Sequence, residues 1–388
     1  MNKRYLSVKV SPISQVIARG DSLRKQGRNI LDAGVGEFYK RTPQEIVDAA
    51  LEGARSAEFG YTDVRGIDAL RSTVVEKYRS EYGFSGVCDS NVIVTAGAKH
   101  ALFNCMQALL NDGDEVVVFS PYWPSYPAMI TAAGGRPIIV SAPEFGVEYD
   151  IQKFSSCLSS RVRAVIINSP SNPSGQKIQQ KTLRLLLNSI LRNSDAFVIF
   201  DEVYKSIDWS NEDDQQLGEW LPSDLISRVI LVNSLSKSCS MTGWRVGYLF
   251  ANDKIINILK NIQSQSISNV TTIAQHAAVY ALKNESRIAL DISRELKVKS
   301  MRLSGVLNEI DGIKIASPFA GFFCFPDVSD LVQRLGLKND IELSERLLDD
   351  YGLLVVPGVA FGRGGHIRLS YGISGHDMDM LCQILSEV

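Results

Sequence analysis

Residues 229–240, which read VILVNSLSKSCS, decide the fold, because a continuous apolar run meets a cluster of small hydroxyl residues around one lysine. Similar apolar runs occur at 91–95, 115–119, 136–140, 164–168 and 197–200, with helical stretches between them. Uniformly apolar strands that alternate with helices are typical of a mostly parallel sheet covered on both faces. Residues 244–250 predict one more strand, which could run antiparallel. We therefore expect an α/β fold around a mostly parallel seven-stranded sheet.

The pattern changes beyond about residue 285. A long charged helix over 285–310 leads into short strands at 313–316, 322–325, 353–356 and 366–371, with a helix at 341–350 among them. This mixture predicts a smaller α+β domain, which the N-terminal segment joins. We expect a large domain over 43–285 and a small domain made from 1–42 and 286–388.

Two local signals mark where the large domain begins. Thr42-Pro43-Gln44-Glu45 has the form of a capping box with proline at the first helical position, which predicts a helix through about residue 57. A second helix is expected to end at Tyr82-Gly83, because glycine is common just past a helix.

The composition excludes several classes of protein. The 388 residues carry 41 Lys and Arg against 43 Asp and Glu, without the basic excess of a nucleic-acid binder. No apolar run approaches the roughly 18 residues of a membrane span, and the N-terminus lacks the apolar core of a signal peptide. We expect a cytoplasmic protein without a nucleic-acid or membrane partner. The six cysteines and four histidines show no ligand spacing, so we expect no metal site.

A ligand of a parallel α/β sheet lies beyond the carboxyl ends of the strands, so the loops there are candidates for the site. An early glycine-rich segment, Gly34-Val35-Gly36-Glu37-Phe38-Tyr39, has tyrosine where a dinucleotide fingerprint needs its third glycine. It also leads to a proline rather than from a strand into a helix. We therefore reject a dinucleotide site and a nicotinamide-dependent dehydrogenase.

Polar residues follow two of the predicted strands. Residues 168–175, NSPSNPSG, come directly after one of them, although a simple turn is the alternative for such residues. Asp201 ends another apolar strand, where an unpaired carboxylate would cost a large desolvation energy. Asp201 and Tyr204 could both reach one ligand if the chain turns after the strand; a capping aspartate is the alternative.

Lys237 is the strongest single candidate. Surface lysines are common, but this one follows an apolar strand and lies among hydroxyl residues, with Arg245 close in sequence. A lysine held in such a pocket near another cation has a lowered pKa, and its neutral amine forms a Schiff base with an aldehyde. The hydroxyls and the guanidinium would suit a phosphate.

Taken together, these residues resemble the fold-type-I pyridoxal-phosphate aminotransferases of class I, in particular the bacterial aspartate aminotransferase subgroup. The resemblance runs from Gly36 to about Tyr371. Five blocks in the same order carry it: VTAGAKHALFN at 94–104, SPYWPSYP at 120–127, NSPSNPSG at 168–175, DEVY at 201–204 and SxSKxxxMTGWRxGY at 234–248.

The resemblance implies three catalytic residues. Lys237 would hold the cofactor as an internal aldimine and later carry the proton between the substrate Cα and the cofactor. Asp201 would pair with the ring nitrogen and keep it protonated, which makes the ring an electron sink. Tyr204, together with Asn172, would hydrogen-bond the phenolic oxygen of the ring.

The resemblance also implies binding residues. Trp123 would stack on the ring, the phosphate would lie at a helix N-terminus after Gly97, and Tyr61 would reach the phosphate of the partner subunit in a homodimer with shared sites. The implied cofactor-binding residues are Gly97, Ala98, Lys99, Trp123, Asn172, Asp201, Tyr204, Ser234, Lys237, Arg245 and Tyr61. The implied substrate-binding residues are Gly36, Lys99, Trp123, Asn172 and Arg368.

Two of these residues imply the substrate. Arg368 matches the arginine that clamps the α-carboxylate, and Lys99 matches a lysine that contacts the distal carboxylate of aspartate or glutamate. An ordinary position in the first turn of a helix is the alternative for Lys99. We expect an enzyme that moves an amino group from L-aspartate, or a similar amino acid, to 2-oxoglutarate by a ping-pong mechanism.

One segment departs from the family pattern. Members usually read GEPDF where this chain has Gly36-Glu37-Phe38-Tyr39-Lys40, and Lys40 and Arg41 are expected to add positive charge near the substrate. This departure leaves other reactions of the same fold open: a β-lyase, a cyclase or a decarboxylase. An aromatic or prephenate aminotransferase is a further alternative.

Overall fold

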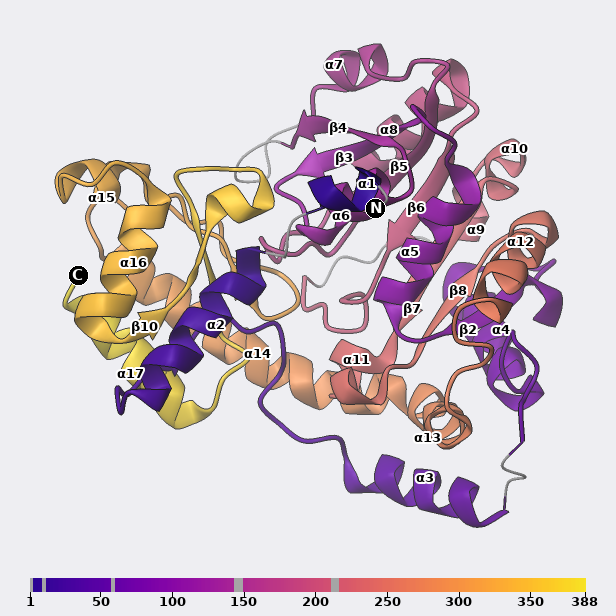
Figure 1. The fold of residues 1–388 in the computed structure, drawn as a ribbon, viewed down its shortest axis with the longest axis horizontal. Helices are drawn as coiled ribbons and strands as arrows, with labels where there is room; N and C mark the ends of the chain where they lie inside the picture. Colours follow the sequence, from indigo (N-terminus) through magenta and orange to yellow (C-terminus); the bar gives the residue numbers. More distant parts are fainter. Residues whose placement is uncertain (1–2, 9–11, 57–59, 143–148, 211–215) are drawn as a thin grey trace.

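A seven-stranded sheet forms the centre of the larger part of the protein (Figure 1). The structure is a computed structural model and describes residues 3–8, 12–56, 60–142, 149–210 and 216–388. The strand order is β2-β8-β7-β6-β5-β3-β4. Six strands run in the same direction, and β8 runs in the opposite one. The strands are β2 (Val92–Thr95), β3 (Glu115–Ser120), β4 (Arg136–Ser141), β5 (Val162–Asn168), β6 (Phe197–Asp201), β7 (Val229–Ser234) and β8 (Gly247–Phe250). The predicted mostly parallel sheet is confirmed.

Both faces of this sheet are buried over its inner strands, which is why those strands are largely apolar, whereas the edge strand β4 is mostly exposed or half-buried. Alternate residues of β3 pack to opposite sides: Val116 and Val118 join one hydrophobic cluster, and Val117 joins another. One face is covered by α5 (Ala98–Leu109), α6 (Ser125–Ala132) and α12 (Asp253–Ser264). The other face is covered by α4 (Asp68–Tyr82), α8 (Gln180–Asn193) and α13 (Thr272–Lys283). The strand ends are thus the places where polar side chains of the sheet can meet a ligand.

The smaller part is built from both ends of the chain. Strand β1 (Leu31–Asp32) pairs in parallel with β10 (Leu353–Leu354), and β12 (Ile367–Ser370) lies between β11 (Val356–Pro357) and β9 (Phe323–Cys324). Its helices are α2 (Pro12–Lys25), α15 (Ser329–Arg334), α16 (Asp340–Tyr351) and α17 (Gly375–Ser386). In Figure 1 the indigo α2 lies among the yellow C-terminal elements, and the long α14 (Glu285–Asn308) extends from the larger part into the smaller one. The domain borders at 42/43 and 285/286 remain a prediction.

The remaining elements are short or lie at the periphery. They are α1 (Lys3–Ser7), α3 (Gln44–Ser56), α7 (Ile151–Ser156), α9 (Leu217–Trp220), α10 (Ser223–Ile226), α11 (Leu235–Ser238) and the 3₁₀ turns Asp89–Asn91, Thr242–Trp244 and Gly358–Phe361. No helix among the described residues is both long enough and apolar enough to cross a membrane.

Two local predictions were wrong and one was confirmed. Thr42 does not cap α3: its hydroxyl donates to the carbonyl of Ser240 (2.6 Å) and accepts from the indole of Trp244 (2.9 Å), because tertiary contacts offered it better partners. The strand expected at 313–316 is reduced to an isolated bridge from Lys314 to Asp327. Gly83 ends α4 with a φ of +70°, as its place after the helix predicted.

Candidate active site

A pocket of about 360 Å³ opens at the carboxyl ends of β5, β6 and β7. Most of the residues predicted from the sequence line it, although they come from distant parts of the chain. These are Gly36, Ala98, Lys99, Trp123, Asn172, Asp201, Tyr204, Ser234, Lys237, Arg245 and Arg368. The fold therefore brings together side chains from sequence blocks that lie far apart along the chain.

Lys237 lies in the short helix α11 directly after β7. The hydroxyl of Ser234 accepts a hydrogen bond from the backbone of Ser236 (3.4 Å) and so caps this helix. The Lys237 ammonium donates to the carbonyl of Gly36 (2.6 Å). Burial lowers its pKa to about 8; the charge of Glu37 opposes this shift, and Arg368 and Arg245 add to it. The neutral, nucleophilic amine is therefore far more populated at neutral pH than in an ordinary lysine, whose pKa is about 10.4.

Asp201 is the last residue of β6 and is 4% exposed. Burial raises the pKa of its carboxyl to about 6, although the hydroxyl of Tyr126, which donates to Oδ2 at 2.5 Å, opposes that rise. The amide of Asn168 donates to the Asp201 carbonyl (2.9 Å) and ties the ends of β5 and β6 together. The site thus holds a carboxylate in a fixed place with little water around it.

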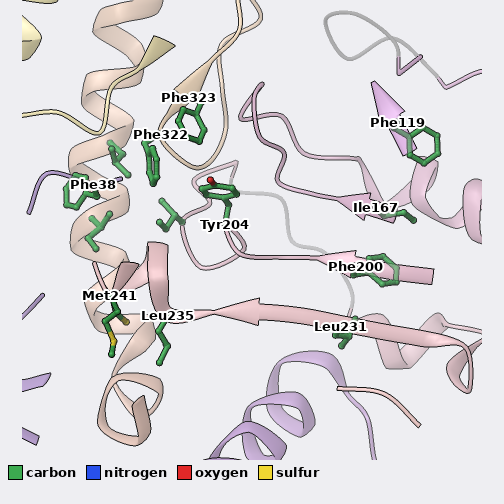
Figure 2. Packing of buried hydrophobic residues seen from close by; sticks show 14 of the residues in the cluster. Phe38, Phe119, Ile167, Phe200, Tyr204, Leu231, Leu235, Met241, Phe322 and Phe323 are labelled. Atoms are coloured by element: carbon green, nitrogen blue, oxygen red, sulfur yellow. The ribbon is translucent and has the colours of Figure 1, made fainter. Parts of the chain in front are cut away.

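Tyr204, Asn172 and Arg368 meet on the side of the pocket nearer the smaller part. Arg368, 1% exposed on β12, donates from Nη1 to the Asn172 amide oxygen (3.0 Å) and from Nη2 to the carbonyl of Gly34 (2.5 Å). Asn172 also hydrogen-bonds Tyr204, whose ring points toward Phe322 and Phe323 (Figure 2). Burial lowers the pKa of Arg368 to about 10. This arginine is a buried cation and not a solvated strand residue.

The N-terminus of α5 forms a backbone cradle beside Arg245. Gly97, the N-cap residue, has a φ of +81°, and a Cβ there would lie 2.6 Å from Nη2 of Arg245. Arg245 donates to the carbonyls of Thr242 (2.7 Å) and Ala96 (3.3 Å), which holds its guanidinium over this turn. A helix N-terminus with a guanidinium beside it binds anions such as phosphate.

Lys99 is the second residue of the same helix, and its side chain lies over the face of Trp123. Its ammonium is 4.8 Å from the centroid of the indole ring. Burial, and secondarily the charge of Arg245, lower its pKa. Lys99 therefore adds a further cation to a pocket that Lys237, Arg245 and Arg368 also line.

Several predicted residues lie outside the pocket. Tyr61 is 92% exposed and does not line it, and Gly97 contributes through the backbone turn rather than through the wall. Lys40 and Arg41 do not line this pocket, so the expectation that they add positive charge near the substrate stays a prediction. Lys40 instead pairs with Glu295 on α14 (2.5 Å).

Sequence reasoning missed other pocket residues. Tyr126 stood within a quoted block, three positions after Trp123, and that helical spacing was a usable signal. Glu37 stood in the atypical segment, but its position beside Lys237 could not be read from spacing. Ile13 and Ser14 reach the pocket from α2 only through the tertiary fold.

Comparison with known proteins identifies the kind of site. The family described as aminotransferase class I and II matches residues 28–385. The chain belongs to this family. It is 30% identical to an aspartate aminotransferase of Bacillus subtilis over all of this chain and 97% of that protein, and 35% identical to a probable aspartate/prephenate aminotransferase of Aquifex aeolicus over 96% and 94%. The structure of Thermus thermophilus aspartate aminotransferase with maleate superposes with a TM-score of 0.92 at 32% identity, covering 100% and 99% of the two chains.

This class I and II aminotransferase depends on pyridoxal 5'-phosphate, as its family does. Its own pocket fits that cofactor on three observations. A side chain at Gly97 would be strained by the positive φ and would meet the Arg245 guanidinium, a half-buried lysine with a lowered pKa faces the pocket, and a carboxylate is fixed at a strand end. In addition, Nε of Arg368 is buried without a hydrogen-bond partner among the described residues.

Proposed function

We propose that this aminotransferase takes the amino group of L-aspartate, or of a similar dicarboxylic amino acid, and delivers it to 2-oxoglutarate in two half-reactions. One observation carries the proposal. Lys99 and Arg368 both face the pocket, and neither forms an ion pair within the parts of the chain that the structure describes. Arg368 is buried, whereas Lys99 is solvent-exposed at the pocket. Two cations that face one pocket without a carboxylate partner favour a ligand that brings two carboxylates, and the buried one favours it most.

The named relatives support the same class of substrate. Enzymes called aspartate aminotransferases align with the whole chain, and one was solved with maleate, a dicarboxylate. Other relatives are named aspartate/prephenate aminotransferases, so prephenate, which also carries two carboxylates, is the second candidate. The atypical segment at 36–40 left a lyase, cyclase or decarboxylase reaction open. Its residues Tyr39 and Lys40 contact Glu295 on α14 and do not line the pocket.

The roles that we propose follow from the position of each side chain. When bound, pyridoxal 5'-phosphate supplies an electrophilic aldehyde carbon and a ring that withdraws electrons. Lys237 would bind that aldehyde carbon through Nζ, and its free amine would accept and return the Cα proton. Arg368 and Lys99 hold the two carboxylates and so fix which bond at Cα faces the ring. Asp201 keeps the ring nitrogen protonated.

The remaining contacts complete this arrangement. Tyr204 and Asn172 bind the phenolic oxygen of the ring, and Trp123 covers one of its faces. The backbone of Ala98 after Gly97, together with Ser234 and Arg245, binds the phosphate. Gly36 approaches the α-carboxylate through its backbone.

Replacing Lys99 tests the substrate class. In a half-reaction screen over the amino acids, followed by the absorbance of the cofactor, we expect wild-type protein to react fastest with L-aspartate or L-glutamate. Lys99→Ala is expected to lower kcat/KM for these two by about 10- to 100-fold, because one charge-assisted hydrogen bond is lost, and to change alanine by only about twofold. Adding 2-oxoglutarate, and in parallel prephenate, identifies the acceptor.

Lys40→Ala is the matched control, because the Lys40 ammonium forms an ion pair with Glu295 outside the pocket. It should leave both substrates unchanged. Equal losses on aspartate and alanine in Lys99→Ala would remove the dicarboxylate argument. Release of pyruvate or ammonia without an oxo-acid acceptor would instead establish elimination.

We further propose a homodimer with shared active sites, a division into domains at 42/43 and 285/286, and a cytoplasmic location. The exposure of Tyr61 in the single chain supports the dimer, since a tyrosine that is 92% exposed is free to enter a neighbouring site. The N- and C-terminal pairing of β1 with β10 supports a small domain made from both chain ends.

Mixing one variant that binds the cofactor weakly with one that is inactive tests whether the sites are shared. Tyr61→Ala is expected to weaken cofactor binding by about 10- to 100-fold and Lys237→Ala to abolish activity. If sites are shared, unfolding and refolding an equal mixture gives mixed dimers with one native site each. Activity should then recover to about a quarter of wild type at limiting cofactor, because half of the dimers are mixed and each has one good site of two. Recovery no greater than the sum of the separate variants would exclude sharing.

A further inference from the structure

Tyr126 is the pocket residue to which neither the sequence nor the proposed roles give a task. It lies in the first turn of α6 and is 3% exposed. Its hydroxyl donates to Oδ2 of Asp201 at 2.5 Å, and that carboxylate is itself buried. Short hydrogen bonds between a neutral hydroxyl and an ionised carboxylate are among the stronger ones in proteins.

The same side chain also contacts Trp123. The two rings meet edge to face, with centroids 5.4 Å apart and planes at 85°, and the backbone amide of Tyr126 donates to the carbonyl of Trp123 (3.0 Å). One tyrosine therefore touches both side chains that we assign to the cofactor ring: the partner of its nitrogen and the residue that covers its face.

We propose that Tyr126 is a positioning residue, which fixes the Asp201 carboxylate by binding Oδ2 so that the proton shared with the cofactor stays on the ring nitrogen. This inference rests on the proposed role of Asp201. With Oδ2 occupied, Oδ1 is the oxygen available to the ring, and within the described residues it receives only a long contact of 3.5 Å from the amide of Val203.

The charges around Asp201 explain why a neutral donor matters there. Burial and the neighbouring Glu202 favour the protonated carboxyl, whereas Lys237 and the hydroxyl of Tyr126 favour the carboxylate. Once Lys237 is bound to the cofactor carbon, its full positive charge no longer faces Asp201. The hydroxyl of Tyr126 then becomes the principal side-chain group that keeps the carboxylate ionised.

A purely structural role is the competing explanation, because Tyr126 also packs in the hydrophobic cluster beneath α5 and α6. The two roles differ in what the hydroxyl does. Phenylalanine preserves the packing and the edge-to-face contact with Trp123, and removes only the hydrogen bond to Asp201.

The test compares Tyr126→Phe with Tyr122→Phe in holoenzyme carrying a cofactor labelled with ¹⁵N in its ring. Tyr122 is half-buried nearby, and among the described residues the hydroxyl that donates to the Asp201 carboxylate is that of Tyr126, which makes Tyr122 the control. In Tyr126→Phe we expect the ring ¹⁵N resonance to move toward the unprotonated position at neutral pH. We expect the rate of the L-aspartate half-reaction to fall about 10-fold, with KM changed by less than about twofold. Tyr122→Phe should match wild type in all three.

Asp201→Asn separates the possible failures. If its resonance moves and that of Tyr126→Phe does not, the role of Tyr126 is refuted while the proposed role of Asp201 stands. If neither variant moves the resonance, both assignments are refuted. A shift in Tyr122→Phe equal to that in Tyr126→Phe would also overturn the inference, because it would reflect general disturbance of the pocket.

Discussion

Lys237→Ala is expected to lower the rate of amino-group transfer by at least about ten-thousand-fold. Two contributions would be lost at once, since in the proposed mechanism the same Nζ binds the cofactor carbon and carries the Cα proton. Proton transfer alone is worth roughly 10²- to 10⁴-fold. Noncovalent binding should survive, because the cradle at Gly97 and Arg245 is untouched. The measurement is twofold: steady-state transfer from L-aspartate, and the mass of the intact protein after borohydride reduction with the cofactor.

Wild-type protein should gain the mass of one cofactor per chain, and Lys237→Ala none. Lys205→Ala is the control. Lys205 also comes shortly after the carboxyl end of a sheet strand, β6, but its ammonium lies over the ring of Tyr82 and not in the pocket. It should keep the covalent mass. An unchanged cofactor adduct in Lys237→Ala, located by peptide mapping on another lysine, would refute the assignment of Lys237.

The proposed covalent bond between Lys237 and the cofactor would also affect the segment around Gly36. In the structure the Lys237 ammonium donates to the Gly36 carbonyl, which ties a residue of the N-terminal segment to the end of β7. The other anchors of this segment do not involve the pocket: the amide of Tyr39 donates to the carbonyl of Gly372 (2.8 Å), and Lys40 pairs with Glu295. If Lys237 binds the cofactor as proposed, Gly36 would lose this hydrogen bond and become available to the substrate, while the segment would stay anchored through Tyr39 and Lys40.

The sheet could be predicted from the sequence because all of its strands except the edge strand β4 are largely buried on both faces. Six strands appear as runs of Val, Ile and Leu, and β7 is buried at every position. Short strands of the smaller part gave a weaker signal. The stretch at 313–316 fails as a strand since only Lys314 finds a partner, and Thr42 has a capping sequence but gives its hydroxyl to Ser240. Propensity was overridden there by tertiary contacts.

The site divides in the same way. Asp201 ends an apolar strand, and Lys237 and Asn172 come a few residues after two others, so the rule that ligands lie at strand ends located them. Glu37 and Ser14 reach the pocket only because the smaller part folds over it, which no local pattern encodes. For Tyr61 the missing information is of another kind, since its proposed site belongs to a second chain.

Asp201→Asn is expected to lower the transfer rate by about a hundred- to a thousandfold while the cofactor stays attached to Lys237. Asparagine keeps the size of the side chain and can still accept from Tyr126, so the pocket should keep its shape. It loses the negative charge, and a neutral amide does not hold a proton on the ring nitrogen in a buried site. The readouts are the rate of the L-aspartate half-reaction and the mass of the borohydride-reduced protein.

Asp208→Asn provides the control for Asp201→Asn, because that carboxylate follows on the same chain segment, pairs with Lys177 (3.1 Å) and does not line the pocket. Its rate should stay within about twofold of wild type. A cofactor analogue methylated on its ring nitrogen carries a permanent positive charge, so it should restore at least about tenfold of the lost rate in Asp201→Asn and nothing in wild type. A loss that the analogue leaves untouched would mean that Asp201 acts on the shape of the site, and the pairing of its charge with the ring nitrogen would have to be abandoned.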